Sequence, residues 1–135
     1  MVYIMKEVIV VARNEIGTLE SMAGALGASG INIETITAYA REPKEAVFRI
    51  ITTDPATTKK ILSRVPHVKN VEESEIIVVK MPNRPGELAK ITKKLAKNGV
   101  DLESVYILSK EKEYTEVALK PVNESFEKAK KVLGV

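Results

Sequence analysis

The sequence predicts an α+β protein in which a β-α-β-β-α-β unit occurs twice along 135 residues. Three observations predict this class. The sequence repeats itself at an offset of 69 residues, each copy contains short β-branched runs typical of strands, and apolar residues at helical spacing follow the first strand of each copy. We therefore expect two antiparallel sheets, each with its helices on one face.

The repeat is in register, without a gap, from Asn14 to Glu34. Six residues have an identical residue 69 positions later. The pairs are Asn14 and Asn83, Gly17 and Gly86, Leu19 and Leu88, Leu26 and Leu95, Gly30 and Gly99, and Glu34 and Glu103. Chance can supply one or two such matches but not the ordered series. The expected domains are therefore residues 1–72 and 73–135.

Each copy is expected to open with a strand and a helix. Val8–Ala12 and Ile76–Val79 are unbroken apolar runs, which are typical of strands buried on both faces. Apolar residues at helical spacing follow the Asn-x-x-Gly loops. These residues are Leu19, Met22 and Leu26 in the first copy and Leu88, Ile91 and Leu95 in the second. Gly30 and Gly99 are expected at the C′ position that ends each helix.

Two further strands and a second helix are expected in each copy. The strands are placed at residues 31–41, 46–53, 100–109 and 114–120. Each pair is joined by a short connection, which favours a hairpin. Asp54-Pro55 and Asn123-Glu124 are N-cap signals for the second helices. A last strand at about residues 67–72 completes the first copy as a ferredoxin-like unit.

The second copy is expected to lack this last strand, because the position 69 residues after Pro66 is Val135. The edge of the strand at Ile76–Val79 would then be unpaired. We expect another segment to cover that edge: the N-terminal stretch, the linker strand or a second subunit.

Composition excludes several kinds of site. The chain has no Cys and one His, so it offers no disulfide, no thiolate nucleophile and no histidine cluster for zinc. No spacing suggests a nucleophile with a base and an orienting group, so we expect no catalytic residue, metal or cofactor. A net charge of +3 and the lack of a long apolar run disfavour nucleic-acid and membrane binding. A soluble, cytoplasmic, non-enzymatic protein is expected.

The repeated motifs resemble the ACT domain, a small-molecule-sensing module of amino-acid metabolism. The segments that carry the resemblance are Asn83-Arg84-Pro85-Gly86-Glu87-Leu88-Ala89 and Asn98-Gly99-Val100-Asp101-Leu102-Glu103-Ser104-Val105, with similar segments at 14–17 and 29–34. The first copy has Ile16 where the family usually has proline. The resemblance covers essentially the whole chain. It implies a stand-alone regulatory pair whose sheets pair edge to edge between domains.

The resemblance also implies where an amino acid would bind. Contacts would come from the strand-to-helix loop and the start of the second strand, at an interface between domains. Carried over to this sequence, the ligand-binding residues are Asn14, Ile16, Gly17, Asn32, Asn83, Pro85, Gly86 and Asp101. The implied partners are an amino acid, a second copy of the chain and a metabolic enzyme. A homodimer is also expected because helices cover only one face of strands that are apolar on both.

Elementary chemistry is consistent with these residues binding an amino acid. A helix N-terminus offers free N–H groups to a carboxylate, and glycine leaves the approach open. An Asn side chain can contact a carboxylate or an ammonium group. Asp101 can neutralise an ammonium group whereas Asn32 cannot, so two pockets of this kind would differ.

The same residues also have structural interpretations. Asn14 and Asn83 could cap their helices, and the glycines could only turn the chain. Arg13 and Arg84, beside the loops, could pair with a ligand carboxylate or face solvent.

Two functions stay open at this point. The first is a non-enzymatic module that senses an amino acid between domains. The alternative is a regulatory or structural subunit with degenerate pockets that docks an enzyme of amino-acid biosynthesis, which Ile16 and the missing strand would favour. A nucleic-acid-binding domain acting through Lys90–Lys97 is the weakest hypothesis, because the strands are mainly aliphatic and Tyr39 and Tyr106 are too few to form a platform for stacked bases.

Overall fold

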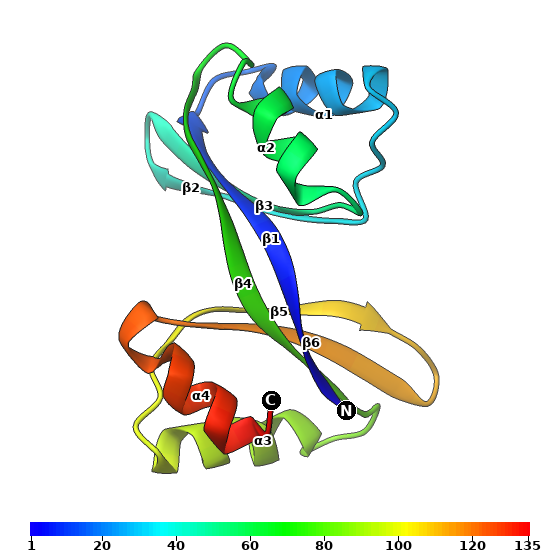
Figure 1. The fold of residues 1–135 in the computed structure, drawn as a ribbon, viewed down its shortest axis with the longest axis vertical. Coiled ribbons are helices and arrows are strands. Elements are labelled where there is room, and N and C mark those ends of the chain that lie inside the picture. Colours follow the sequence, from blue (N-terminus) through cyan, green and yellow to red (C-terminus); the bar gives the residue numbers. More distant parts are fainter. The chain divides into compact units, whose positions relative to one another are not determined.

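A computed structural model describes all 135 residues and divides them into two compact units. One unit is Lys6–Ser74, and the other combines Met1–Met5 with Glu75–Val135. The expected ranges, 1–72 and 73–135, follow chain order, whereas the contacts group the first five residues with the later unit. The α+β class is confirmed: in each unit the strands pair antiparallel and both helices lie on one face of the sheet (Figure 1).

The unit Lys6–Ser74 follows the expected β-α-β-β-α-β order. Its elements are β1 (Val2–Arg13, from Lys6 onward), α1 (Thr18–Ala28), β2 (Thr35–Glu42), β3 (Glu45–Ile51), α2 (Pro55–Leu62) and the first part of β4 (Val68–Pro82). The strands lie in the order β2-β3-β1-β4, with β3 antiparallel to both β1 and β2. This is the ferredoxin-like strand order.

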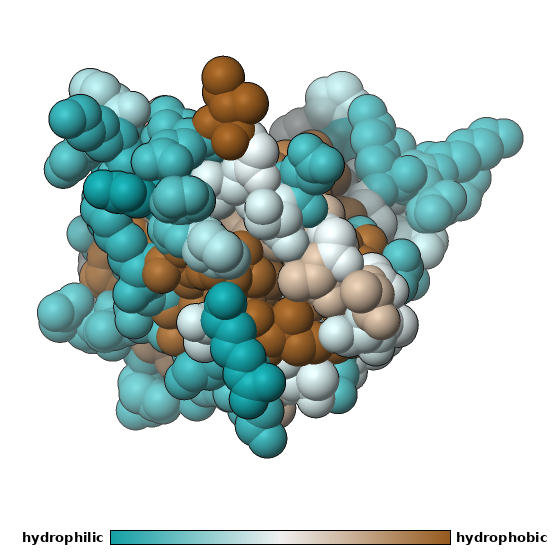
Figure 2. Space-filling view, turned by 90° about the horizontal axis from the view of Figure 1, so that it is seen from above, coloured by the Kyte–Doolittle hydropathy of each residue, from teal (hydrophilic) through white to brown (hydrophobic).

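The core of this unit lies between the sheet and its helices. Val8 and Val10 of β1 are fully buried in one cluster with Met22 and Leu26 of α1. Ile9, on the opposite face of β1, is only 6% exposed, so the strand is buried on both faces, as its unbroken apolar run predicts. Figure 2 looks onto the side that carries α1 and α2, where apolar surface lies between hydrophilic side chains.

The other unit has the same plan, except that the start of β1 takes the position of its last strand. Its elements are the start of β1, the later part of β4, α3 (Glu87–Lys97), β5 (Leu102–Lys110), β6 (Tyr114–Pro121), a 3₁₀ turn (Asn123–Ser125) and α4 (Phe126–Leu133). The strand order is β1-β4-β6-β5, and the core gathers Ile77, Leu95, Leu119 and Ala129. The longest helices of the chain have 11 residues, and none is long and apolar enough to cross a membrane.

The N-terminal stretch takes the place of the missing last strand. The Lys80 N–H donates to the Met1 carbonyl at 2.9 Å, and Val2 and Ile4 pack against the core of this unit. The Tyr3 hydroxyl donates to the Glu116 carboxylate on β6. The expectation that another segment covers the edge of the Ile76–Val79 run is therefore confirmed, and the segment is the beginning of β1.

Both first helices end as the sequence predicts. Gly30 and Gly99 have φ angles of 75° and 67°, a left-handed conformation that favours glycine. The next residue donates its N–H back into the helix, from Ile31 to the Leu26 carbonyl at 2.9 Å and from Val100 to the corresponding Leu95 carbonyl at 3.0 Å. Each helix thus closes with a Schellman motif.

The two N-cap predictions have different outcomes. The Asp54 carboxylate accepts the Thr57 N–H at 3.1 Å, so Asp54 caps α2 as expected. The prediction for Asn123 is wrong: Asn123 opens a 3₁₀ turn and its side chain caps nothing. The first copy has Pro55 at the first helical position, where its fixed φ favours an immediate helix, and the second copy has Glu124 there.

Several strand boundaries differ from those expected: the first strand begins at Val2 rather than Val8, and β5 begins at Leu102 rather than Val100. The strands expected at residues 67–72 and 76–79 form one 15-residue strand, β4. The strand expected from residue 31 begins at Thr35. Ile31 and Ile33 point into the core as strand residues would, but backbone pairing starts only where the Glu34 N–H reaches the Ile51 carbonyl at 2.9 Å.

Candidate ligand-binding site

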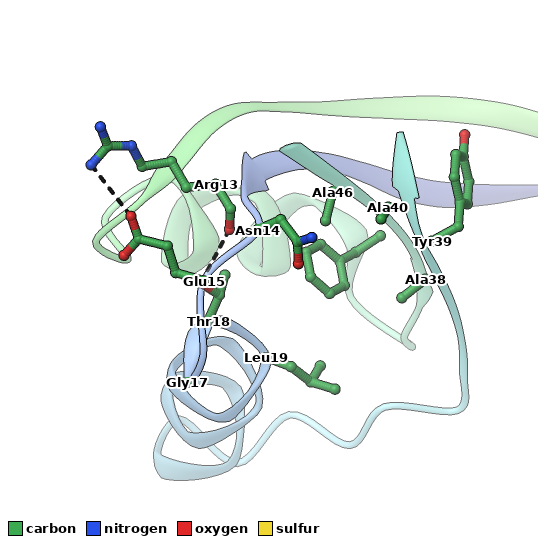
Figure 3. A pocket seen from close by; sticks show the side chains of 11 residues that line it. Arg13, Asn14, Glu15, Gly17, Thr18, Leu19, Ala38, Tyr39, Ala40 and Ala46 are labelled. Atoms are coloured by element: carbon green, nitrogen blue, oxygen red, sulfur yellow. Dashed lines mark hydrogen bonds and ion pairs between the residues drawn. The ribbon is translucent and has the colours of Figure 1, made fainter. Parts of the chain in front are cut away.

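The strand-to-helix loop of the unit Lys6–Ser74 borders a cavity of about 290 Å³ (Figure 3). Residues 13–15 and the first turn of α1 form one wall. The other wall consists of Ala38–Ala40 of β2 with Ala46 and Phe48 of β3. The small alanine side chains leave the space into which Leu19 projects (Figure 3).

Gly17 sits where α1 begins and turns the chain into the helix. Its φ is 92°, and no side chain caps the helix, so the first-turn N–H groups have no side-chain acceptor. A Cβ at Gly17 would meet nothing within 4 Å, so the backbone angle, rather than a lack of space, requires glycine. Gly86 has the same role in α3, with φ 88° and no side-chain cap. The helix N-terminus is therefore open to an anion in both copies.

The two Asn residues do not cap helices, so that structural interpretation is wrong. The Asn14 side-chain amide donates to the Pro43 carbonyl at 3.3 Å, and the Asn83 amide donates to the Glu111 carbonyl at 2.7 Å. Each Asn ties its loop to the hairpin turn that follows the second strand. This use of the NH₂ group leaves the side-chain carbonyl of Asn14, at the cavity, available as an acceptor.

The structure brings together only part of the predicted site in the first copy. Asn14 and Gly17 line the cavity, whereas Ile16 and Asn32 are not among its lining residues. Ile16 is fully exposed at the tip of the loop. Asn32 is exposed and lies three residues before the start of β2.

In the second copy, Asn83, Pro85 and Gly86 lie on the matching loop, whereas Asp101 lies immediately before β5. Pro85 and Gly86 are exposed beside the half-buried Asn83. The exposed Asp101 precedes β5, and its backbone is held on both sides: its N–H donates to the Ser125 hydroxyl at 3.2 Å and its carbonyl accepts the Val122 N–H at 3.0 Å. The roles of these residues in binding stay predictions.

Both arginines beside the loops are paired with carboxylates. Arg13 Nη1 lies 3.6 Å from Glu15 Oε1, and Figure 3 shows this pair pointing away from Leu19 and Ala38. Glu15 also contacts His67 Nε2 at 3.3 Å, and the Arg13 N–H donates to the His67 carbonyl at 2.9 Å. This cluster braces the loop against the chain that leads into β4. His67 has φ 71°, a conformation rare for a residue other than glycine.

The second loop is braced differently. Glu87 accepts from Lys90 at 2.9 Å and from Arg84 at 3.0 Å. These two cations lower the pKa of Glu87, with Lys90 the larger cause. No three His, Asp or Glu side chains anywhere in the chain come together as a metal-binding group.

Sequence reasoning did not place the strand residues at the first cavity. Ala38 and Ala40 of β2 line this cavity together with Ala46 of β3. Alanine has no polar side-chain group, so these positions carry no sequence signal for ligand binding. The signal that could have located them is the clustering of small residues in an otherwise bulky hairpin.

The fold defines a class of small α+β units with the ferredoxin-like strand order, present here as a pair. Residues 76–134 match the family model of the ACT domain. The resemblance stated from the sequence is confirmed there, and the match runs from β4 through α4. No curated protein sequence matches the chain closely enough to count as a relative.

Solved structures with the same fold include proteins similar to nearly the whole chain. Protein BT0572 from Bacteroides thetaiotaomicron is 26% identical with a TM-score of 0.83, over 98% of this chain and 88% of its own. The regulatory subunit of aspartate kinase from Thermus thermophilus is 17% identical with a TM-score of 0.61, over 98% and 94%. A structure of aspartokinase alpha and beta subunits is 19% identical with a TM-score of 0.61, over 98% and 93%. The last two likenesses show the fold alone.

Proposed function

We propose that the chain is a non-enzymatic regulatory module that binds a small α-amino acid in the cavity beside Asn14 and Gly17. One observation carries the proposal: an uncapped helix N-terminus, entered through a left-handed glycine, opens at a cavity that also holds an amide side chain. A helix N-terminus of this kind favours a carboxylate.

The cavity offers a group for each part of a zwitterion. The first-turn N–H groups of α1 would receive the carboxylate, and the side-chain carbonyl of Asn14 would accept from the ammonium group. Leu19 and Phe48 would contact the ligand side chain. A volume of about 290 Å³ suits a small amino acid.

The second copy supports a further pocket of different character. We propose Asn83, Pro85, Gly86 and Asp101 as its ligand contacts, with Ile16 and Asn32 as the first copy's additional ones. The Asp101 carboxylate would neutralise an ammonium group, which the Asn32 amide cannot do. The proposed partners are a second copy of the chain and an enzyme whose activity the bound amino acid regulates. The likeness to a regulatory subunit of aspartate kinase favours this kind of partner.

A thermal-shift screen of the full chain against the standard amino acids tests the proposal. A ligand at a hundred times its dissociation constant adds about 2.7 kcal/mol to the native state, which raises the melting temperature by several degrees at this size. Ala40→Phe fills the cavity and is expected to abolish the shift. Ala28→Phe, at an exposed position of α1 outside the cavity, is the matched control and should retain it.

A second candidate function is favoured by Ile16, a fully exposed isoleucine at the loop tip. Ile16 also stands where the family usually has proline, as expected of a subunit with degenerate pockets that docks an enzyme. Capture of an amino-acid-biosynthesis enzyme by the wild-type chain but not by Ile16→Ser, with no melting shift and no calorimetric binding of any amino acid, would replace the first proposal with this one.

A further inference from the structure

A second cavity lies in the unit Lys6–Ser74, between α1 and α2. Its volume is about 370 Å³, and none of its lining residues borders the cavity beside Asn14. Ala25, Ile61 and Val65 form an apolar floor, in which Val65 is 7% exposed and belongs to the core. The rim carries Ser21, Ser29 and Arg64. This is the side of the molecule seen in Figure 2.

The cavity exists because one side of α1 carries only small residues. Ser21, Ala25 and Ser29 follow one another at four-residue intervals, so they lie on the same side of the helix and face the same space. Their side chains are too short to fill the space next to α2.

The second copy shows that the fold does not require this hollow. The corresponding positions of α3 and its end carry large side chains, namely Lys90, Lys94 and Asn98. On the second helix, Lys130 replaces Ile61 and Leu133 replaces Arg64. The apolar floor and the rim cation are therefore features of the first copy alone.

The rim has unused polar groups. Arg64 has no ion-pair partner, and the hydroxyls of Ser21 and Ser29 make no side-chain hydrogen bond. An arginine fork matches a carboxylate geometrically, and a serine hydroxyl can donate to the same oxygen atoms. One cation above an apolar floor is complementary to an anion with an apolar body.

We propose that this cavity is a second ligand site, which takes a small monocarboxylic acid with a branched-chain or aromatic body. The carboxylate pairs with Arg64 at the rim, and the apolar body lies on Ile61 and Val65. The volume lies within the range of about 300–1,000 Å³ typical of small-molecule pockets. The apolar surface is limited to the four side chains of Ala25, Ile61, Val65 and Pro66, between polar rims, which suits a small molecule better than a helix from a second copy.

The experiment uses the full chain with isovalerate and phenylacetate as probes, followed by amide chemical shifts and calorimetry. The uncharged 3-methyl-1-butanol is the control ligand. Binding should shift the amides of residues 61–66 and of α1 near Ala25. Arg64→Leu, which installs the residue of the second copy at an exposed position, is expected to weaken binding about tenfold or more. It should also remove the preference for the acid over the alcohol.

Ala25→Lys, again the residue of the second copy, should fill the cavity and abolish binding. Ala28→Lys places the same side chain on the exposed part of α1 and should leave binding unchanged. Retained binding in both Ala25→Lys and Arg64→Leu, no binding by wild type, or shifts confined to residues 13–19 would overturn the proposal. Concentration-dependent dimerisation that Ala25→Lys abolishes, without carboxylate binding, would show that a second copy occupies the groove.

The result is separable from the amino-acid proposal. Ala40→Phe, which blocks the cavity beside Asn14, should leave carboxylate binding intact. Ala25→Lys should leave the amino-acid melting shift intact, so either proposal can fail while the other stands.

Discussion

At the scale of single residues, an ion pair within the unit Lys6–Ser74 is the largest departure from an apolar interior. Glu7 is 0% exposed and Arg49 5% exposed, and Arg49 Nη1 lies 2.6 Å from Glu7 Oε1. The corresponding residues of the second copy are Ile76 and Ala118, both fully buried. A buried ion pair loses hydration on folding, and its mutual attraction offsets this loss only while both partners are present.

Removal of one partner is therefore expected to be costly. Arg49→Met removes the cation that lies 2.6 Å from the buried Glu7 carboxylate and should lower the free energy of unfolding by about 3–5 kcal/mol. The double variant Glu7→Ile/Arg49→Ala, with the residues of the second copy, should be more stable than Arg49→Met. Urea unfolding followed by circular dichroism measures both.

Arg41→Met provides the matched control. Arg41 pairs with Glu45 at 2.7 Å, but half of the Arg41 side chain is exposed to solvent. Solvent screening limits such a pair to about 1 kcal/mol or less. Equal losses from Arg49→Met and Arg41→Met would show that burial does not govern the first pair.

At the scale of elements, the start of β1 is fastened to its unit by a polar contact as well as by backbone pairing. The Tyr3 hydroxyl donates to Glu116, and the Ser109 hydroxyl donates to the other oxygen of the same carboxylate at 2.8 Å. The Tyr3 bond is the main cause of the lowered pKa of Glu116. Burial, and then the bond to Glu116, raises the pKa of Tyr3 to about 12.

Tyr3 is expected to make stability depend on pH in the alkaline range. Its folded pKa of about 12 exceeds the ordinary tyrosine value of 10.0, so the folded chain retains this proton to higher pH than the unfolded chain. The contribution of Tyr3 is complete below about pH 10 and is lost as the pH rises toward 12. The difference in unfolding free energy between wild type and Tyr3→Phe should therefore change across this interval.

Absorbance of phenolate provides a direct measurement. Of the four tyrosines, Tyr3 should ionise near pH 12 in the folded protein, and Tyr3→Phe should remove that step. Tyr39→Phe, at a half-exposed position on β2, is the control and should leave the step in place. A wild-type titration without a step near pH 12 would contradict the assignment.

At the scale of the whole molecule, two strands contribute to both units. β1 supplies Met1–Met5 to one unit and its remaining residues to the other, and β4 divides in the same way after Ser74. The later unit is therefore discontinuous in sequence, and its sheet depends on residues that precede the first copy. A cut between the two repeats in chain order would separate that sheet from one of its strands.

Deletion of residues 1–5 is expected to weaken the later unit selectively. The Lys80 N–H would lose its acceptor, the Met1 carbonyl, and the core would lose Val2 and Ile4. Hydrogen exchange should show faster exchange at Lys80 and along β6. Amides of the β1–β3 pair around Val10 and Phe48, in the other unit, should stay protected and serve as the internal control. Unchanged protection of Lys80 would contradict this role of the N-terminal strand.

The confirmed predictions rest on signals read within a few residues of one another. The helix ends at Gly30 and Gly99 and the cap at Asp54 depend on hydrogen bonds between residues no more than five positions apart. Asn14 was harder to interpret, because its partner, the Pro43 carbonyl, is 29 residues away in sequence. Asn123 resembled a cap locally, but the backbone instead forms a 3₁₀ turn before α4.

The doubled β-α-β-β-α plan, the ACT resemblance and the need to cover the edge of the Ile76–Val79 run could all be predicted from the sequence. The reason is that hydrophobic periodicity, glycine positions and the register of the repeat can each be read directly along the chain. Three features became apparent only in the folded chain: Met1–Met5 fill that edge, the Asn side chains brace hairpins, and small residues of α1 leave a cavity beside α2. These features depend on side chains meeting across long stretches of chain, and neither composition nor spacing specifies which distant groups come into contact.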